Sequence, residues 1–213
     1  YLQQADVLRD LRQKLIPKLS EGVQKELCDL NLENARFDIT MKPLASPQEA
    51  GLDQIQMMFS ANPGIPLQPL DSVASGGELA RVMLALRLQD VSASQSQPVL
   101  IFDEIDAGLS GEALKKLAEK LQNVAKSTQV IVVTHQPLLA GAAQHHWHLI
   151  KTLDEQSQEA EHRVSECDLT VSTHAFLLAN AQNRKLVLAQ MASGELSGNS
   201  AVAQKFAASL LAG

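Results

Sequence analysis

Val99-Leu100-Ile101-Phe102-Asp103-Glu104 is the stretch of this sequence that decides the fold. An apolar run of this length that ends in charged residues is typical of a buried strand. We expect that strand over residues 98–103, followed by a helix over 111–126 and a second apolar strand from Gln129 to Val133. Continuously apolar strands separated by helices predict a parallel sheet with helices on both faces. The sequence therefore predicts an α/β fold.

A short turn that contains two glycines, Ser75-Gly76-Gly77-Glu78, precedes this strand. Apolar residues recur at helical spacing from Gly76 to about Gln89, and Ser75 and Glu78 match the Ser-x-x-Glu pattern that caps helix N-termini. Glycines at a helix start leave backbone N–H groups open to an anion, which the positive end of the helix attracts. A helix cap with nothing bound gives the same pattern, so this turn alone leaves both interpretations open.

Three side chains with catalytic potential are expected at the carboxyl ends of the strands, where open α/β sheets bind ligands. Asp103 and Glu104 end the first strand, and His135 ends the second. Neighbouring strand residues point to opposite faces, so one carboxylate can hold Mg²⁺ while the other orients or deprotonates an attacking water. His135 can hydrogen-bond a terminal phosphate oxygen. The alternatives are carboxylates that only cap the next turn and a histidine packed in the core.

The first 30 residues carry the pattern of an amphipathic helix. Apolar residues recur every three or four positions from Leu8 to Leu30, opposite a charged face. Pro17 lies inside this pattern and is expected to kink or interrupt the helix. An ordinary surface helix and the last turns of a coiled coil that enters a head domain both fit these residues.

Shorter elements are expected in the rest of the chain. Residues Arg36 to Lys42 and Asp53 to Phe59 alternate apolar and polar side chains, which predicts two antiparallel strands joined by a loop from Pro43 to Gly51. Three prolines between Asn62 and Leu70 are expected to exclude regular structure. In the last third we expect a helix that begins at Pro137 and a strand near His146 to Lys151. A hairpin tip over 154–161 and a returning strand from Arg163 to Cys167 should follow. The tail should be helical from about Ala175, with breaks at Gly194 and Gly198.

Composition limits the classes of protein that this sequence can encode. The 213 residues, 45% of them hydrophobic, are enough for one sizeable domain. A formal charge of −6 argues against a surface that is basic throughout, but 18 Lys and Arg leave room for a local nucleic-acid patch. No apolar run reaches the roughly 20 residues that cross a bilayer. The chain begins with Tyr1 and no signal-peptide pattern, so we expect it to be a piece of a longer polypeptide.

Taken together, the motifs resemble those of the ATP-binding-cassette ATPases. Ser75 to Glu78 is similar to the signature motif of that superfamily, Val99 to Glu104 to its Walker B strand, and Thr134-His135 to its switch histidine. Within the superfamily, roughly residues 35–213 resemble the RecN family of SMC-like bacterial repair ATPases. The stretches that carry this narrower resemblance are Asn62 to Leu70, Val73 to Leu86, Phe102 to Gly111, Val132 to Gln136, Met191 to Gly194 and Leu210 to Gly213.

The resemblance implies a split ATPase head in which residues 34–213 form the C-terminal lobe. That lobe would be mainly a parallel sheet flanked by helices, with an antiparallel strand pair, and residues 1–33 would be the helical end of a coiled coil. In this family the N-terminal lobe carries the phosphate loop, and no Gly-x-x-x-x-Gly-Lys-Ser/Thr sequence occurs in these 213 residues. The pocket is therefore expected to be incomplete, with the N-terminal lobe of the same protein as its first partner.

The resemblance also implies a role for each motif residue. In the family, two heads form a homodimer that encloses two ATP molecules. Asp103 would coordinate Mg²⁺, Glu104 would be the general base, and His135 would contact the γ-phosphate. The signature residues Ser75, Gly76, Gly77 and Glu78 would bind the ATP that the opposite head holds.

The D-loop of the family corresponds to Asp106 to Leu109, which would cross the dimer and contribute Asp106 to the nucleotide site. Ser110 stands where many cassette ATPases have a D-loop aspartate. This departure leaves the role of the loop less well defined than that of the other motifs.

The family role implies DNA as a further partner, no membrane, and a cytoplasmic location at the bacterial nucleoid, because the family tethers or organises DNA during double-strand-break repair. The head of a chromosome-organising SMC protein and a non-catalytic dimerisation module are alternatives, and the presence of Glu104 weighs against the second. A transporter nucleotide-binding domain is disfavoured, since a strand pair and a possible coiled-coil end precede the signature motif instead of a phosphate loop and a helical subdomain.

Overall fold

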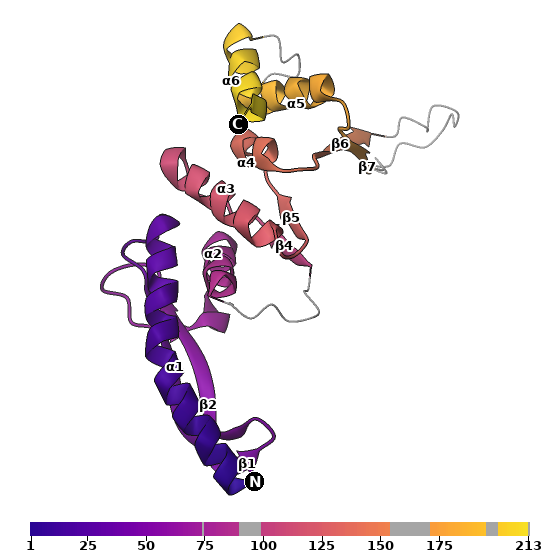
Figure 1. The fold of residues 1–213 in the computed structure, drawn as a ribbon. Coiled ribbons are helices and arrows are strands. Elements are labelled where there is room, and N and C mark those ends of the chain that lie inside the picture. Colours follow the sequence, from indigo (N-terminus) through magenta and orange to yellow (C-terminus); the bar gives the residue numbers. More distant parts are fainter. Residues whose placement is uncertain (74, 90–98, 154–170, 195–199, 213) are drawn as a thin grey trace, which may run out of the picture. The chain divides into compact units, whose positions relative to one another are not determined.

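The computed structural model describes residues 1–73, 75–89, 99–153, 171–194 and 200–212. These residues divide into two units, Tyr1–Thr134 and His135–Gly213 (Figure 1). The turn over residues 75–78, the apolar strand before Glu104 and the first helix all belong to the first unit, whereas His135 begins the second.

The first unit opens with α1, Leu2–Asp29, one continuous helix of 28 residues. Pro17 lies inside it, so of the two effects that we expected, a kink or an interruption, the interruption does not occur. A proline inside a helix costs about 3 kcal/mol, because it removes a backbone hydrogen bond. Packing on both sides of the proline offsets this cost: Arg9 pairs with Asp53 of β2 on one side, and Val23 and Leu27 are fully buried on the other.

The apolar residues of α1 form two faces instead of the single stripe that their spacing suggests. Val23 and Leu27 lie in the core, but Val7, Leu11 and Leu15 are 60%, 53% and 59% exposed. Residues four apart share one face of a helix, so these three form a continuous apolar row that no described residue covers. No helix in the described part of the chain, α1 included, has the length and hydrophobicity needed to cross a membrane.

Two long strands follow α1 and run beside it (Figure 1). β1, Arg36–Gln48, pairs antiparallel with β2, Gly51–Ser60, in a register that is irregular between Pro43 and Gln48. The predicted loop over 43–51 is therefore wrong, because the strands continue to a turn at residues 49–50. β1 tolerates its prolines because it is an edge strand of the β1-β2-β3 sheet, where one row of N–H groups has no ladder partner.

The proline-rich stretch after β2 also contains regular structure, against our expectation. β3, Gln68–Pro69, pairs antiparallel with β2, and the 3₁₀-helix η1, Leu70–Ser72, follows directly. The loop before β3 is held by the Ser60 hydroxyl, which donates to the backbone oxygens of Asn62 and Ile65 at 3.1 and 3.0 Å. Proline is compatible with β3 because this strand, too, lies at the edge of the sheet.

The core of the first unit forms where α1, the hairpin and α2, Gly76–Leu88, meet. Full burial of each large apolar side chain contributes about 1.5–3 kcal/mol. The buried members of this core are Val23, Leu27, Leu32, Ala35, Phe37, Ile39, Phe59, Val82 and Ala85. This packing anchors the helix that carries the signature motif.

The predicted β-α-β unit is confirmed. β4, Leu100–Asp103, leads to α3, Gly111–Ala125, and then to β5, Val130–Val133. β4 and β5 pair in parallel from Leu100↔Val130 to Asp103↔Val133, so the fold is α/β. Among the described residues these are the only two parallel strands, and the other two sheets are antiparallel.

One face of the β4–β5 pair is open, although we expected helices on both faces. Ile101, Ile131 and Val133 are 68%, 43% and 48% exposed, whereas Phe102 on the other face is buried. Asp103 is exposed as well and shares the open face with Ile101, because strand residues two apart point the same way. Helices α2 and α3 contact the pair, and its exposed face ends at Asp103, the predicted Mg²⁺ ligand.

The second unit contains the predicted helix at Pro137 and an antiparallel strand pair. α4, Pro137–Ala142, precedes β6, Trp147–Leu153, which pairs with β7, Val171–Leu177. The predicted hairpin tip over 154–161 and returning strand over 163–167 lie outside the described residues.

The tail of the second unit becomes helical later than we predicted. Ala175 lies within β7, and the helices are α5, Ala181–Ser193, and α6, Ala201–Ala212. α5 ends at Gly194, whose φ of +69° is a left-handed conformation that glycine adopts easily. Arg184 of α5 donates to the backbone oxygens of Ala140, Gly141 and Ala143, which fixes α5 to the end of α4.

A cluster of charges joins the end of α1 to α3 within the first unit. The Lys116 Nζ lies 3.3 Å from one carboxylate oxygen of Asp29. The Lys120 Nζ lies 3.0 Å from the second carboxylate oxygen of Asp29. Lys120 also donates a hydrogen bond to Glu26. The hydrogen bond from Lys120 lowers the pKa of Asp29, against an opposing effect of burial. Burial acts to lower the pKa of Lys120, but its hydrogen bonds to Glu26 and Asp29 raise that pKa above its ordinary value.

This cluster predicts an acid-sensitive attachment of α1. The pKa of Asp29 is lower in the folded state than its ordinary value of 3.8, so its stabilising effect is complete above that value and is lost as pH falls through the folded pKa. Urea unfolding between about pH 5 and pH 2 should therefore show a smaller acid-induced loss of stability in Lys120→Met than in the wild type. Lys126→Met, on the exposed end of the same helix, is the control, and equal acid slopes in all three proteins would contradict the assignment.

Candidate functional site

β4 ends at Asp103, which is exposed, and Glu104 is the first residue after the strand. Glu104 has a φ of +55°, which is uncommon for a non-glycine residue, and such strained positions are concentrated at functional sites. β4 ends at Asp103, so strand alternation does not place the two carboxylates on opposite faces as we expected. The Ala107 N–H donates to the Glu104 backbone oxygen at 3.0 Å, which closes a tight turn over 104–107.

The signature turn begins α2 in the predicted way. Ser75 is the N-cap, and its hydroxyl oxygen accepts from the Glu78 N–H at 3.4 Å. Ser75 and Gly76 are exposed, and a Cβ added at Gly76 would meet nothing within 4 Å. The first turn of α2 is therefore open to an approaching anion at these two residues.

Gly77 has a different role from Gly76, because it packs on the turn after β4. A Cβ added there would lie 2.9 Å from the Ala107 Cβ and 3.0 Å from the Glu104 backbone oxygen. The signature turn and the turn that carries Glu104 are thus in direct contact within one chain. Two motifs that are separate in the sequence form one surface.

The two glycines give a matched test of this contact. Gly77→Ala should lower the free energy of unfolding by about 1–3 kcal/mol, because the added methyl group must displace backbone atoms. Gly76→Ala should leave the stability nearly unchanged, since open space surrounds the new Cβ. Urea unfolding of both variants checks the prediction, and equal stabilities would contradict the contact between Gly77 and the 104–107 turn.

Arg81 and Asp106 are buried beneath this surface, with 6% and 1% of their areas exposed. Arg81 Nη1 donates to the backbone oxygens of Ile105 at 3.2 Å and Ala107 at 2.7 Å. Burial lowers the pKa of Arg81, and the charges of Glu78 and Asp106 counteract that effect. The Asp106 carboxylate accepts from the Thr134 hydroxyl at 2.5 Å.

These positions alter the roles expected from the sequence. Asp106 was expected to contribute to the nucleotide site, but its burial argues against direct contact with a ligand and favours a supporting role. Arg81 was not predicted at all. Its spacing could have identified it, since Arg81 lies four residues after Gly77 and four before Ala85, on the buried face of α2.

His135 is exposed, so it is not the packed core histidine that the sequence left open. Its Nε2 lies 3.3 Å from the Gln136 Nε2, and Thr134 precedes it directly. Among the described residues, His146 is a buried histidine, and its pKa is lowered by burial and by the charges of Arg184 and His148. In the described part of the chain, no three His, Cys, Asp or Glu residues gather as a metal site would require.

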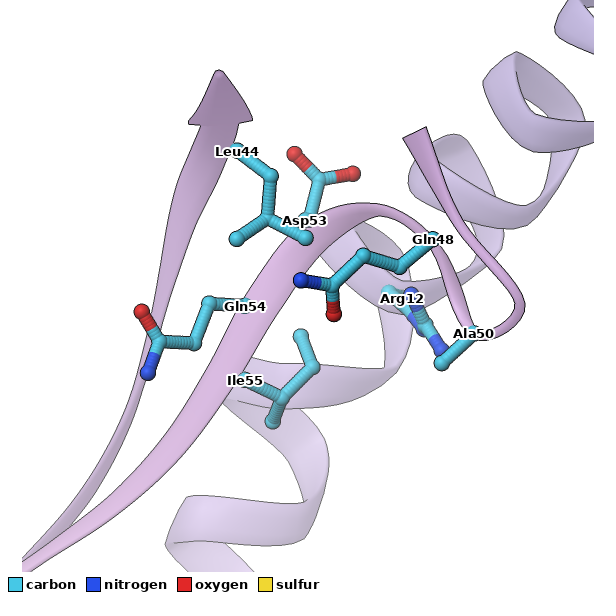
Figure 2. A pocket seen from close by; sticks show the side chains of 7 residues that line it. All are labelled: Arg12, Leu44, Gln48, Ala50, Asp53, Gln54 and Ile55. Carbon is cyan, nitrogen blue, oxygen red and sulfur yellow. The ribbon is translucent and has the colours of Figure 1, made fainter. Parts of the chain in front are cut away.

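Two cavities of the first unit are lined by none of the predicted site residues. One of about 400 Å³ lies between α1 and the hairpin (Figure 2) and the other, of about 460 Å³, beside β2 and η1. The first is lined by Arg12, Leu44, Gln48, Ala50, Asp53, Gln54 and Ile55. Neither cavity includes Ser75, Asp103 or Glu104, which lie on the surface instead.

The sequence comparisons with known proteins agree on one family. A sequence model of the family described as the RecF/RecN/SMC N terminal domain matches residues 3–160. The DNA repair protein RecN of Rickettsia typhi is 40% identical over 177 residues, which cover 83% of this chain and 29% of that protein. RecN of Synechocystis is 36% identical over 202 residues, or 94% of this chain and 34% of that protein. The chain thus spans about a third of the length of these relatives.

Solved structures of SMC heads are more distant. The Smc head domain of Pyrococcus furiosus, bound to the C-terminal domain of ScpA, is 20% identical with a TM-score of 0.45, over 78% of this chain and 36% of that chain. A structure from work on ATP-driven dimerization and DNA-stimulated activation of SMC ATPases is 18% identical with a TM-score of 0.40, over 82% of this chain and 92% of that chain. These likenesses are too distant to assign roles to individual residues.

Proposed function

Because this chain belongs to the RecF/RecN/SMC N-terminal domain family, we propose that it forms the C-terminal lobe of the ATPase head of an SMC-like DNA repair protein. One observation carries this proposal. The signature turn and the turn with Asp103 and Glu104 touch each other and are exposed, yet the sequence has no phosphate loop. Such an arrangement suits a nucleotide site that other polypeptide segments complete.

Each exposed polar residue has a role in this proposal. Asp103 fits a Mg²⁺ ligand, because its carboxylate is exposed at a strand end and Mg²⁺ needs only one or two protein carboxylates beside water and phosphate. The bound ion would neutralise charge on the phosphates. Glu104 accepts a proton from the attacking water, and His135 donates a hydrogen bond to a γ-phosphate oxygen. The exposure of Glu104 and His135 supports both roles.

The signature turn acts on the ATP of a second head. Ser75 and Gly76 are exposed, and a Cβ added at Gly76 would meet nothing within 4 Å, so a phosphate can approach the backbone and hydroxyl groups of this turn closely. Glu78 lies in the same first turn. Because these groups lie on the surface of the lobe, a second copy of the head can bring its bound ATP to them, and ATP then holds a homodimer together.

The N-terminal lobe of the same protein covers the open face of β4 and β5. Ile101, Ile131 and Val133 form an exposed apolar face that ends at Asp103. Burying such a face is favourable by about 25 cal/mol per Å². A lobe that covers it would bring its phosphate loop to the side of the sheet that carries the Mg²⁺ ligand.

Residues 1–33 form the end of a coiled coil. The exposed row Val7, Leu11 and Leu15 supports this assignment, since it offers a second helix an apolar seam on the face of α1 that the hairpin leaves free. α1 also contacts the hairpin, α2 and α3, so movement of the coiled coil would reach the elements beside the nucleotide site.

DNA is the proposed substrate of the complete protein, in the repair of double-strand breaks by recombination. The matched relatives are named DNA repair proteins, and this is the support for the proposal. The net charge of −6 of the 213 residues argues against a surface that is basic throughout, so DNA contact within them would need a local basic patch. The protein would act in the bacterial cytoplasm, at the nucleoid.

Steady-state ATP hydrolysis by the complete protein, with and without double-stranded DNA, tests the function. We expect Mg²⁺-dependent turnover that the 213-residue chain alone lacks. If the complete protein bound ATP and dimerised without any turnover, the non-catalytic dimerisation module would be the better assignment. If it neither bound nor hydrolysed ATP, the proposed function would be wrong.

A further inference from the structure

Three polar side chains connect the signature helix, the turn after β4 and the end of β5. They are Arg81, Asp106 and Thr134, of which the first two are almost completely buried. We infer that they form a relay through which the signature turn and the residue before His135 move together. The relay assigns a positioning role to all three residues, none of which needs to touch a nucleotide.

Arg81 forms the first half of the relay. Its Nη1 donates to two carbonyl oxygens, those of Ile105 and Ala107, which flank Asp106 in the chain. Gly77, one turn earlier in α2, packs against the Ala107 Cβ and the Glu104 backbone oxygen. A shift of α2 relative to this turn would leave a buried guanidinium without partners, which costs more than the loss of an ordinary hydrogen bond.

Asp106 and Thr134 form the second half. The Thr134 hydroxyl donates to the Asp106 carboxylate at 2.5 Å, a short bond to a charged acceptor. Thr134 directly follows Val133, which pairs with Asp103 in the parallel register of β4 and β5. The hydroxyl therefore ties the end of β5 to the turn after β4, beyond the last backbone pair of the two strands.

The relay has a consequence that rests on the proposed function. In a dimer, the signature turn of one head acts on the ATP of its partner, whereas His135 acts on the ATP of its own head. The relay runs from the signature turn to Thr134, the residue before His135. Closure of the signature turn on the ATP of the partner would thus shift Thr134.

Hydrogen exchange of the complete protein without nucleotide tests the relay. Thr134→Val removes the hydroxyl and keeps the shape of the side chain. We expect the protected amides of Ala107, Leu109 and Leu79 to exchange about tenfold faster or more, because a hydrogen bond to a charged group changes a local opening equilibrium by at least that factor. Leu79 is decisive, since it lies in α2 and no bond joins it to Thr134 directly.

Two variants of the same kind control this experiment. Thr134→Val should also lower the kcat for ATP hydrolysis. Thr134→Ser keeps the hydroxyl, so its hydrogen exchange and its kcat should match those of the wild type. Thr40→Val removes a hydroxyl bond to the Gln56 backbone oxygen in the hairpin and should leave Leu79 unchanged. Unchanged exchange at Leu79 in Thr134→Val, or equal exchange in the Val and Ser variants, would overturn the relay.

A variant at the other end keeps the test decisive if Thr134→Val does not fold. In Arg81→Gln the new side chain is shorter and uncharged, so the amides of Ala107 and Leu109 should exchange faster. Wild-type exchange at these two amides would again overturn the relay. These measurements need no ATP, so they test the relay even if the protein proves not to be an ATPase. Wild-type ATP hydrolysis with unaltered exchange in the variants would instead refute the relay and leave the proposed function intact.

Discussion

Replacing Glu104 by Gln in the complete protein should lower the kcat for ATP hydrolysis by about 10²- to 10⁴-fold, the usual contribution of a general base. Gln keeps the size of the side chain but cannot accept the proton of the attacking water. ATP binding should stay near the wild-type affinity, because the proposed phosphate contacts come from other residues. Single-turnover hydrolysis and equilibrium ATP binding measure the two effects separately.

Glu119→Gln is a suitable control for this substitution, since Glu119 is an exposed acid of α3. It makes the same chemical change away from the 104–107 turn and should leave kcat unaffected. Wild-type turnover in Glu104→Gln would remove Glu104 from the catalytic role. A parallel loss of ATP binding would indicate a binding role instead.

Ser75→Arg should abolish ATP-driven pairing of heads and spare ATP binding by a single head. A long side chain at the exposed N-cap of α2 would occupy the space through which the phosphates of the opposite ATP approach the N–H groups. Sedimentation velocity with and without a non-hydrolysable ATP analogue measures pairing, and we expect the dimer only in the wild type.

Ser75→Ala separates this steric effect from the loss of the helix cap. Loss of the Ser75 hydroxyl bond to the Glu78 N–H should cost about 1 kcal/mol of stability but leave the approach open. The alanine variant should therefore still pair, more weakly than the wild type. Full pairing of Ser75→Arg would mean that the signature turn does not face the second head's ATP.

The sequence predicted the elements whose signals are local. The helix from Ser75, the β-α-β unit and the helix at Pro137 lie close to their predicted bounds, because a capping serine, an apolar strand and an N-terminal proline each act through their immediate neighbours. Ser75, Asp103 and Glu104 are exposed, and their roles in a nucleotide site stay predictions.

The errors arose where long-range packing decides the outcome. The helix continues through Pro17 because contacts on both sides hold it, and the hairpin extends past Pro43 because β1 is an edge strand. The burial of Arg81 and Asp106 depends on carbonyl and hydroxyl groups about 25 residues away in the chain, so no short pattern encodes it. Apolar strands alone predicted helices on both faces of β4 and β5, but Ile101, Ile131 and Val133 are exposed on one of them.

The most direct test of the account is calorimetric titration of the 213-residue chain with ATP and Mg²⁺, alone and together with the N-terminal lobe. We predict no measurable binding to the chain alone and clear binding once the lobe is added, with retention of the nucleotide by the assembled head. Tight stoichiometric ATP binding by the chain alone would contradict the claim that its motifs form only part of a pocket.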